Sequence, residues 1–235
     1  METKNTVYKV EFDALPDEIP IFPLDGAVLL PGGQLPLNIF ERRYVAMVED
    51  VMRSNRIIGM IQSRHGQCED AVLAESPERD KCAKSPSLYK IGCAGKITAF
   101  EEMEDDRYLI TLSGLSRFEI ESELEPRSGY RRVRPDWKKF QKDFERVDCI
   151  NLDRDRLKSL LAKYFDQQGI SCNGDIIDEA SDSRIVTCLS MICPLETSEK
   201  QALLEAPCCK ERADLFMTIL EMAIHSNCDP DLCKH

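Results

Sequence analysis

Three stretches near the N-terminus decide the fold: Ile19-Pro-Ile-Phe-Pro23, Ala27-Val-Leu-Leu-Pro-Gly-Gly33 and Leu35-Pro-Leu-Asn-Ile39. Each contains an apolar run of strand length, and Pro31-Gly32 separates two of them with a dipeptide typical of a turn. Proline has no backbone N–H to donate to a sheet. We therefore expect the strands that hold Pro20, Pro23 and Pro36 to lie at sheet edges or beside bulges.

A helix and further strands are predicted to follow. Apolar side chains recur with helical spacing from Tyr44 to Met52, and Ile57–Ile61 reads as a short buried strand. From Tyr89 apolar and polar positions alternate. The alternation continues in residues 107–112 and 117–121, on either side of a turn predicted at Ser113-Gly114, and Tyr130–Arg134 is the last predicted strand. This pattern predicts a curled antiparallel sheet, closed or nearly so.

The last third of the chain is predicted to be helical, starting near Asn151. Ser198, followed three residues later by Gln201, matches a capping box and predicts a short helix that runs to Pro207. We expect the apolar stripes of the other helices to pack against one another as a core. These stripes comprise Leu157, Leu160, Leu161, Tyr164 and Phe165; then Ile185, Val186, Leu189 and Ile192; and finally Leu215, Phe216, Ile219, Leu220, Ala223 and Ile224.

Composition narrows the classes of function. The 235 residues carry a formal net charge of −11, which disfavours nucleic acid as a partner because the phosphate backbone is also negative. The N-terminus shows no signal peptide, and no apolar run approaches the ~20 residues that a membrane span needs. We therefore expect a soluble cytoplasmic protein with no membrane partner, in which most of the 11 cysteines are reduced thiols.

Motifs for catalysis are missing from the sequence. Gly95-Lys96 is the only Gly-Lys pair and lies inside a strand pattern, so the sequence has no phosphate-binding loop of the Walker type. The nucleophile-elbow and His-Glu-x-x-His patterns are also missing. Only three histidines occur, and although a Cys–His pair could form in the fold, nothing in the sequence singles one out. We predict no catalytic residues and no enzymatic activity.

The C-terminus holds the one candidate metal site. His225, Cys228, Cys233 and His235 are four zinc-type ligands within eleven residues. Structural zinc sites usually include a Cys-x2-Cys pair, which this sequence lacks, so the alternative interpretation is a polar terminus with incidental thiols. We predict no cofactor and keep zinc as the alternative.

The opening stretches resemble the N-terminal (LON substrate-binding) domain family of Lon proteases. The resemblance lies in residues 19–25, 28–32 and 35–44, and it covers about residues 18–225 of this chain. Several motifs in the right order make it specific. The later ones are residues 58–62, 91–97, 107–114, Arg117-Phe118 and 199–205.

This resemblance implies an α+β fold, with a PUA-like antiparallel β pseudo-barrel followed by a C-terminal helical subdomain. The implied boundaries are an N-terminal tail over residues 1–17, the barrel over 18–148, the helical subdomain over 149–226 and a C-terminal tail over 227–235. It also implies a noncatalytic protein that recognises polypeptides, either unfolded proteins or protease clients, in protein quality control. The chain looks like a free-standing bacterial member without the ATPase and peptidase domains of Lon proteases.

The family's signature residues are the candidates for polypeptide binding in this chain: Pro23, Leu24, Pro31, Pro36, Leu37, Phe40, Glu41 and Tyr44. They also have a structural interpretation. Pro31 fixes a turn, Phe40 and Tyr44 anchor the helix to the barrel, and Glu41 lies in the first helical turn beside an arginine. Open strand edges at residues 19–23 and 35–39 would accept an incoming strand.

The expected partners are polypeptide substrates or a separate protease. Two alternatives stay open. PUA-like barrels can bind RNA, and residues 131–134 form a local basic patch with Trp137, Lys138 and Lys139. The other alternative is a scaffold stabilised by zinc at the C-terminal cluster.

Overall fold

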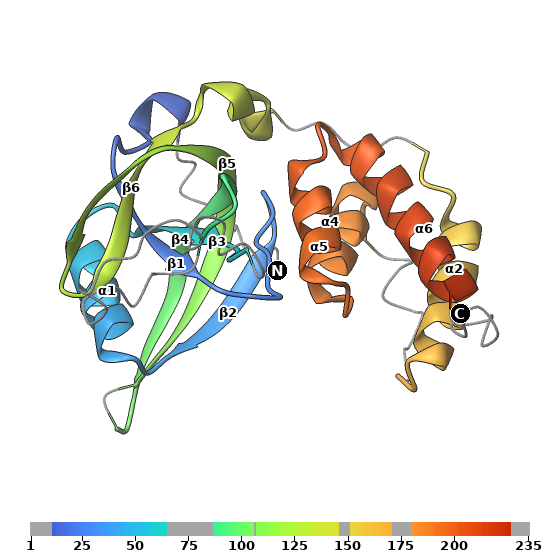
Figure 1. The fold of residues 1–235 in the computed structure, drawn as a ribbon, viewed down its shortest axis with the longest axis horizontal. Coiled ribbons are helices and arrows are strands. Elements are labelled where there is room, and N and C mark those ends of the chain that lie inside the picture. The colour runs from blue at the N-terminus through green and yellow to red at the C-terminus, as the bar shows by residue number, and fades with distance from the viewer. Residues whose placement is uncertain (1–10, 65–86, 106, 146–150, 171–179, 227–235) are drawn as a thin grey trace, which may run out of the picture.

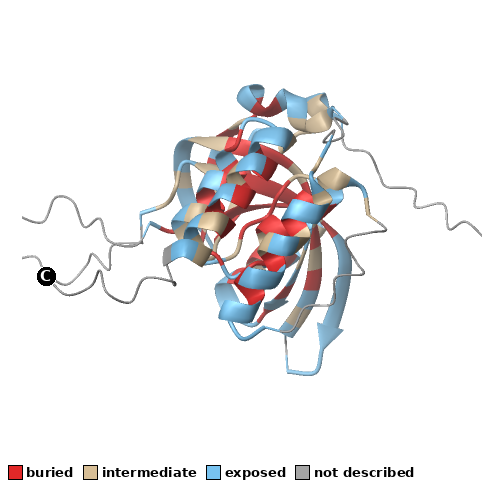
Figure 2. Cartoon of the chain, turned by 90° about the vertical axis from the view of Figure 1, so that its right-hand side faces the viewer, coloured by how far each residue is buried: buried red, intermediate tan, exposed pale blue. Residues whose placement is uncertain are grey.

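The computed structural model describes residues 11–64, 87–105, 107–145, 151–170 and 180–226. A β-rich subdomain is followed by a subdomain made of helices, which lie side by side with it (Figure 1). Buried residues run through the middle of the molecule, and exposed residues cover the outer faces of the helices (Figure 2). This architecture confirms the predicted α+β class with C-terminal helices.

Six strands form one sheet: β1 (Ile19–Pro23), β2 (Gln34–Ile39), β3 (Ile57–Ile61), β4 (Ile91–Met103), β5 (Arg107–Arg127) and β6 (Tyr130–Asp136). Their order is β2-β5-β4-β3-β1-β6, and β5 also pairs with β6. That pairing closes β5, β4, β3, β1 and β6 into a ring, which confirms the predicted pseudo-barrel. One pair, β1–β3, is parallel, whereas the sequence predicted an antiparallel sheet throughout.

Strand β5 pairs with three other strands, β2, β4 and β6. One prediction about it was wrong. It runs 21 residues without a turn, although a turn was predicted at Ser113-Gly114. Gly114 instead allows the backbone at Leu30 to pass close to β5, because a Cβ at this position would lie 2.0 Å from the carbonyl oxygen of Leu30. The predicted turn at Pro31 is confirmed, since Gly32 has φ +78° and the N–H of Gly33 donates to Leu30 O at 2.9 Å.

The expectation that strands with proline lie at sheet edges or beside bulges holds for only one of the two strands. Pro36 lies in β2, for which β5 is the one neighbour among the described strands, as expected. Strand β1 lies between β3 and β6 with no register shift in either pairing, so the prediction that it lies at an edge or beside a bulge was wrong. It tolerates Pro20 because the ladder with β3 begins only at Ile21, which leaves Pro20 beside a partner strand on one side.

Helix α1 (Arg42–Met52) packs on the barrel through the predicted apolar face. The Tyr44 ring lies 4.2 Å from that of Phe22, centroid to centroid, and is buried, which confirms it as an anchor. Phe40 does not anchor the helix: it lies beyond the end of β2 and is 65% exposed. Glu41 is the N-cap residue and lies just before the first turn; its carboxylate pairs with Arg43 at 2.8 Å.

The helical subdomain contains α2 (Arg154–Gln167), α4 (Asp182–Ile192), α5 (Thr197–Glu205) and α6 (Cys209–Ser226). The predicted stripes form its core, except that Ile192 is 71% exposed. The capping box of α5 uses Glu196 and Glu199, not Ser198 and Gln201, because the helix begins at Thr197 and Ser198 already lies inside it. No helix in the described ranges is long and apolar enough to cross a membrane.

The side chain of Arg117, on β5, joins the barrel to the helices. Its guanidinium forms a bidentate pair with Asp143 of the 3-10 helix η2 (Lys138–Phe144), with Nη2–Oδ1 at 2.7 Å and Nε–Oδ2 at 3.0 Å. Nη1 donates to the carbonyls of Leu204 and Ala206 at 3.1 and 2.6 Å. These carbonyls end α5, where the helix dipole favours a cation. Both charged side chains are at most 8% exposed.

Helix α5 makes further contacts with the barrel. Gln62 Nε2, at the end of β3, donates to Gln201 Oε1 at 3.0 Å, and Gln201 Nε2 donates to Ile91 O at 3.0 Å. Lys200 Nζ donates to Gly26 O at 2.7 Å, and burial lowers the pKa of this lysine. Leu204 belongs to the apolar core of the barrel. Polar and apolar contacts together therefore seat α5 on the sheet.

We predict that Arg117→Met lowers the free energy of unfolding by about 3–5 kcal/mol, because it leaves the Asp143 carboxylate buried without its partner. Urea denaturation of the whole chain measures the change. The double variant Arg117→Met/Asp143→Leu removes both charges and should recover part of this loss. Equal losses in the single and double variants would contradict the assignment of the cost to an unpaired charge.

Candidate functional site

A groove of about 510 Å³ lies between α1 and the end of the β4–β5 hairpin. Helix spacing places Arg42, Val45, Ala46 and Glu49 along its α1 wall. Phe40 closes the end next to β2, and Asp105 and Tyr108 form the hairpin wall. Its volume falls within the range of roughly 300–1,000 Å³ that is usual for ligand pockets.

Two aromatic side chains, Phe40 and Tyr108, line this groove, and Phe100 contacts one of them. Phe40 is 65% exposed, and Phe100, 41% exposed, has its ring 4.9 Å from that of Tyr108. The Tyr108 hydroxyl donates to Glu49 at 3.2 Å, which ties the hairpin to α1. Ile39 pairs with Tyr108 at the last position of β2. The groove thus continues from a strand that has one neighbour among the described strands.

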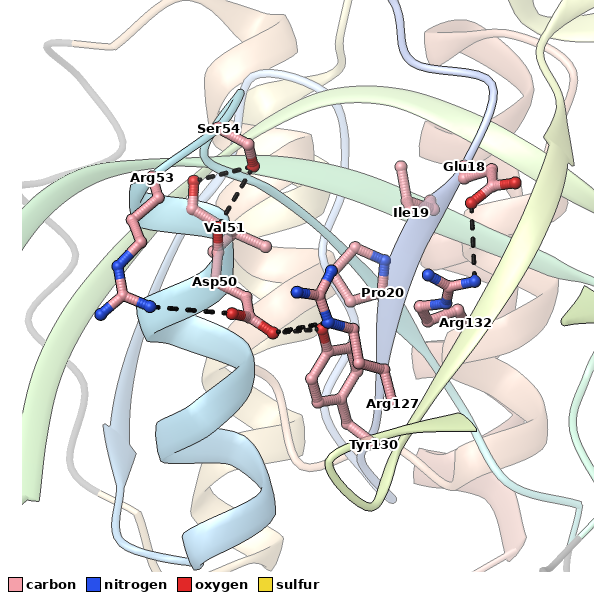
Figure 3. Close-up of a pocket in the computed structure, with 10 residues that line it drawn as sticks. All are labelled: Glu18, Ile19, Pro20, Asp50, Val51, Arg53, Ser54, Arg127, Tyr130 and Arg132. Carbon is pink, nitrogen blue, oxygen red and sulfur yellow. Dashed lines mark hydrogen bonds and ion pairs between the residues drawn. The ribbon is translucent and has the colours of Figure 1, made fainter. Parts of the chain in front are cut away.

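A second pocket, of about 310 Å³, lies at the C-terminal end of α1 (Figure 3). We call it the arginine pocket because Arg53, Arg127 and Arg132 line it, from the end of α1, the end of β5 and the middle of β6. Glu18 and Asp50 are the acidic residues of its lining. Three guanidinium groups therefore face two carboxylates in a chain whose net charge is −11.

The ion pairs in the arginine pocket are long. Arg127 Nε lies 3.3 Å from Asp50, Arg53 Nη1 lies 3.9 Å from the same carboxylate, and Arg132 Nη2 lies 3.6 Å from Glu18. Arg132 Nε is buried and has no hydrogen-bond partner among the described residues. The strong hydrogen bond of the pocket comes from the Tyr130 hydroxyl, which donates to Asp50 Oδ2 at 2.8 Å.

Burial and the neighbouring Asp50 carboxylate raise the pKa of Tyr130 to about 12. Desolvation is the larger cause, and the hydrogen bond to Asp50 adds to it because it requires the protonated phenol. Tyr130 is therefore neutral at physiological pH and acts as a donor. Asp50 in turn receives Tyr130, Arg127 and Arg53, so this carboxylate organises one side of the pocket.

The signature residues do not converge on one site. Phe40 reaches the groove, and Pro36 is exposed on the neighbouring strand β2. Glu41 is exposed at the start of α1. Tyr44 and Leu37 are buried in the barrel core, with Leu24 packed against it. Pro23 ends β1, and Pro31 forms the turn. Sequence reasoning missed the arginine pocket, because Arg53 is more than seventy residues from Arg127 and Arg132 and the three match no motif.

The basic patch proposed for RNA is neutralised in part. Arg131 pairs with Glu123 at 2.5 Å, and Lys139 pairs with Glu119. Trp137 is 9% exposed, and its Nε1 donates to Pro16 O, so its ring packs in the core and offers no face to a base. These contacts favour a structural role for the patch.

The metal candidates lie mostly outside the described residues. His225 is near the end of α6, whereas Cys228, Cys233 and His235 lie outside the described ranges, so the zinc hypothesis stays a prediction. Among the described residues, no three side chains of ligand type come together. The Cys93 thiol is buried, and burial raises its pKa far above the usual range, which keeps it protonated and unreactive.

Known proteins similar to this chain are Lon proteases. The profile of the ATP-dependent protease La (LON) substrate-binding domain matches residues 18–222. Lon protease 2 of Myxococcus xanthus is 24% identical over 208 residues, which cover 88% of this chain and 24% of that protein. The Lon protease of Anaeromyxobacter dehalogenans is 30% identical over 120 residues, or 51% of this chain and 13% of that protein. The chain spans about a quarter or less of the length of these relatives.

Solved structures show the same fold. The Lon N-terminal domain protein from Xanthomonas campestris superposes with a TM-score of 0.54 at 20% identity, covering 86% of this chain and 97% of that one. The N-terminal domain of a Mycobacterium avium complex Lon protease gives a TM-score of 0.53 at 14% identity, covering 87% and 98%.

We predict that Tyr130→Phe makes stability less dependent on alkaline pH. The pKa of Tyr130 in the folded chain is above its unfolded value near 10, so the hydrogen bond contributes fully below pH 10 and its contribution is lost as pH rises towards about 12. The variant should be less stable by about 1 kcal/mol at pH 8, and the difference should shrink between pH 10 and 12. Urea denaturation across this range measures it; a difference independent of pH would contradict the role of Tyr130.

Proposed function

Because the chain belongs to the family of the LON substrate-binding domain, we propose that it is a noncatalytic protein that binds polypeptides in an extended form at the groove beside α1. The single observation that carries this proposal is the exposed Phe40 at the junction of the groove and strand β2. A large apolar side chain this exposed, in one groove with the half-buried Val45, Ala46 and Tyr108, marks a surface for interaction.

Backbone pairing supports an extended ligand. Strand β2 pairs with β5 on one side, and no described strand pairs with its other side. A polypeptide that adds to this side would receive main-chain hydrogen bonds from β2 and reach the groove with its next side chains. Pro36 removes one donor from β2, which limits the length of such a pairing. The proposal therefore joins a short strand contact to a side-chain pocket.

Charge favours one class of polypeptide. Glu49 and Asp105 in the groove outnumber Arg42, and the hairpin adds the exposed acids Glu101 and Glu102. An apolar segment flanked by Lys or Arg is the complementary ligand, because opposite charges speed association and disfavour acidic competitors. Unfolded proteins expose such segments. This property fits a role in protein quality control, as a recognition module for clients or beside a separate protease.

We predict that Phe40→Ser weakens binding of a fluorescent basic peptide with two aromatic residues by about tenfold, the equivalent of about 1.4 kcal/mol. Phe100→Ser should have a smaller effect in the same direction. The exposed position of Phe40 means that the substitution leaves stability within about 0.5 kcal/mol. Fluorescence anisotropy gives the dissociation constant, and thermal denaturation checks the fold.

The matched control is Ile192→Ser, which removes a similarly exposed apolar side chain from α4, a helix that contributes no residue to the groove lining. It should leave peptide binding unchanged. An acidic version of the peptide should bind more weakly than the basic one, and added salt should reduce this preference. Equal losses in the Phe40 and Ile192 variants would refute the groove as the binding site.

A further inference from the structure

The arginine pocket has more hydrogen-bond donors than its own acceptors use. Each guanidinium carries five N–H groups in a planar fork, yet the ion pairs of Arg53, Arg127 and Arg132 are 3.3–3.9 Å long. Arg132 Nε has no partner among the described residues although it is buried. Buried donors normally have partners, and an exception calls for a functional explanation.

We propose that the arginine pocket binds a carboxylate of a polypeptide ligand, held by the guanidinium fork of Arg132, with Arg127 as a second positive charge in the same lining. A carboxylate matches the guanidinium fork with two parallel hydrogen bonds, the strongest geometry available to arginine. Ile19, Pro20 and Val51 also line the pocket and supply apolar contact for the carbon atoms next to that carboxylate. The proposal rests on the proposed binding of polypeptides and adds a second point of recognition.

The two sites lie along one helix. The groove uses Arg42, Val45, Ala46 and Glu49 of α1, and the arginine pocket uses Asp50 and Val51 of the same helix together with Arg53. The groove carries excess acid and the pocket carries excess base. A polypeptide with a basic, apolar segment and a free carboxylate is complementary to both.

The Glu18 carboxylate would compete with a ligand carboxylate for Arg132. Its carboxylate is 47% exposed and lies 3.6 Å from Arg132, too far for a hydrogen bond. Without a ligand, Glu18 neutralises the arginine. Because its side chain is half-exposed, a ligand carboxylate that forms true hydrogen bonds with Arg132 can displace it. Removing this internal competitor should therefore strengthen ligand binding, whereas a purely structural ion pair would show no such gain.

The test uses short glycine-serine peptides, which have no apolar side chains and therefore do not depend on the groove. One peptide has a free C-terminal carboxylate, a second is amidated, and a third is amidated with one internal aspartate; inorganic phosphate is a fourth probe. The Nε–H resonance of Arg132 in the labelled, full-length chain reports binding by NMR. We expect it to shift with the free C-terminus or with the aspartate, and not with the neutral amidated peptide.

Four variants sharpen the test. Arg132→Gln and Arg127→Gln should each weaken carboxylate binding about tenfold, followed through the other resonances of the pocket. Glu18→Gln should strengthen it about threefold or more. The matched control is Arg156→Gln, which removes the same charge from an exposed pair with Glu221 in the helical subdomain and should change nothing.

The outcomes separate this proposal from the function proposed above. A shift with the free C-terminus alone assigns the pocket to chain ends, and a shift with both carboxylate peptides assigns it to acidic groups in general; each supports the proposal. Response to phosphate alone, equal response to the neutral peptide, or no gain in Glu18→Gln would overturn it. Binding of the aromatic peptide at the groove would survive those results, because it is measured through Phe40.

Discussion

The arrangement of the two subdomains depends on the buried pair of Arg117 and Asp143. Arg117 extends from the long strand of the barrel, binds Asp143 on one side and donates hydrogen bonds to the C-terminal carbonyls of α5 on the other. Its ring contact with Phe140, 4.9 Å from guanidinium carbon to ring centroid, fills the remaining side. A charge buried this deeply is tolerable only when its hydrogen bonds are satisfied. The pair therefore fixes where α5, and with it the helical subdomain, meets the sheet.

The sequence predicted the elements well where local pattern determines them. Alternation in the first half of β5 and the helical spacing of α1, α2 and α6 reflect the face that each element buries, and this face is a property of the element itself. Strand β4 departs from its predicted alternation, since Gly92 to Gly95 are all buried. Gly114 failed as a turn because its small size serves a contact with Leu30, which is distant in sequence. Phe40 failed as an anchor because an aromatic residue just beyond a strand can face either core or solvent, and only the tertiary structure decides.

The candidate sites were predictable to a smaller degree. Phe40 was identified through a family resemblance, but the hairpin that completes its groove was not. Arg117 occupies the polar position of the alternating run that includes Phe118 and Ile120, so the pattern assigns it to solvent. It is buried because α5 and η2 cover that face of β5. The arginine pocket likewise depends on residues from α1, β5 and β6, which only closure of the barrel brings together.

The pairing of β1 with β6 has a consequence for the growing chain. Ile19 pairs with Val133. On the ribosome, β1 therefore emerges about a hundred residues before its partner β6. At usual rates of translation this delay is on the order of ten seconds. During that time an apolar strand with an unpaired side is available to other nascent chains. Pro20 and Pro23 have no N–H and so interrupt its row of donors, a feature that disfavours pairing with foreign strands during synthesis.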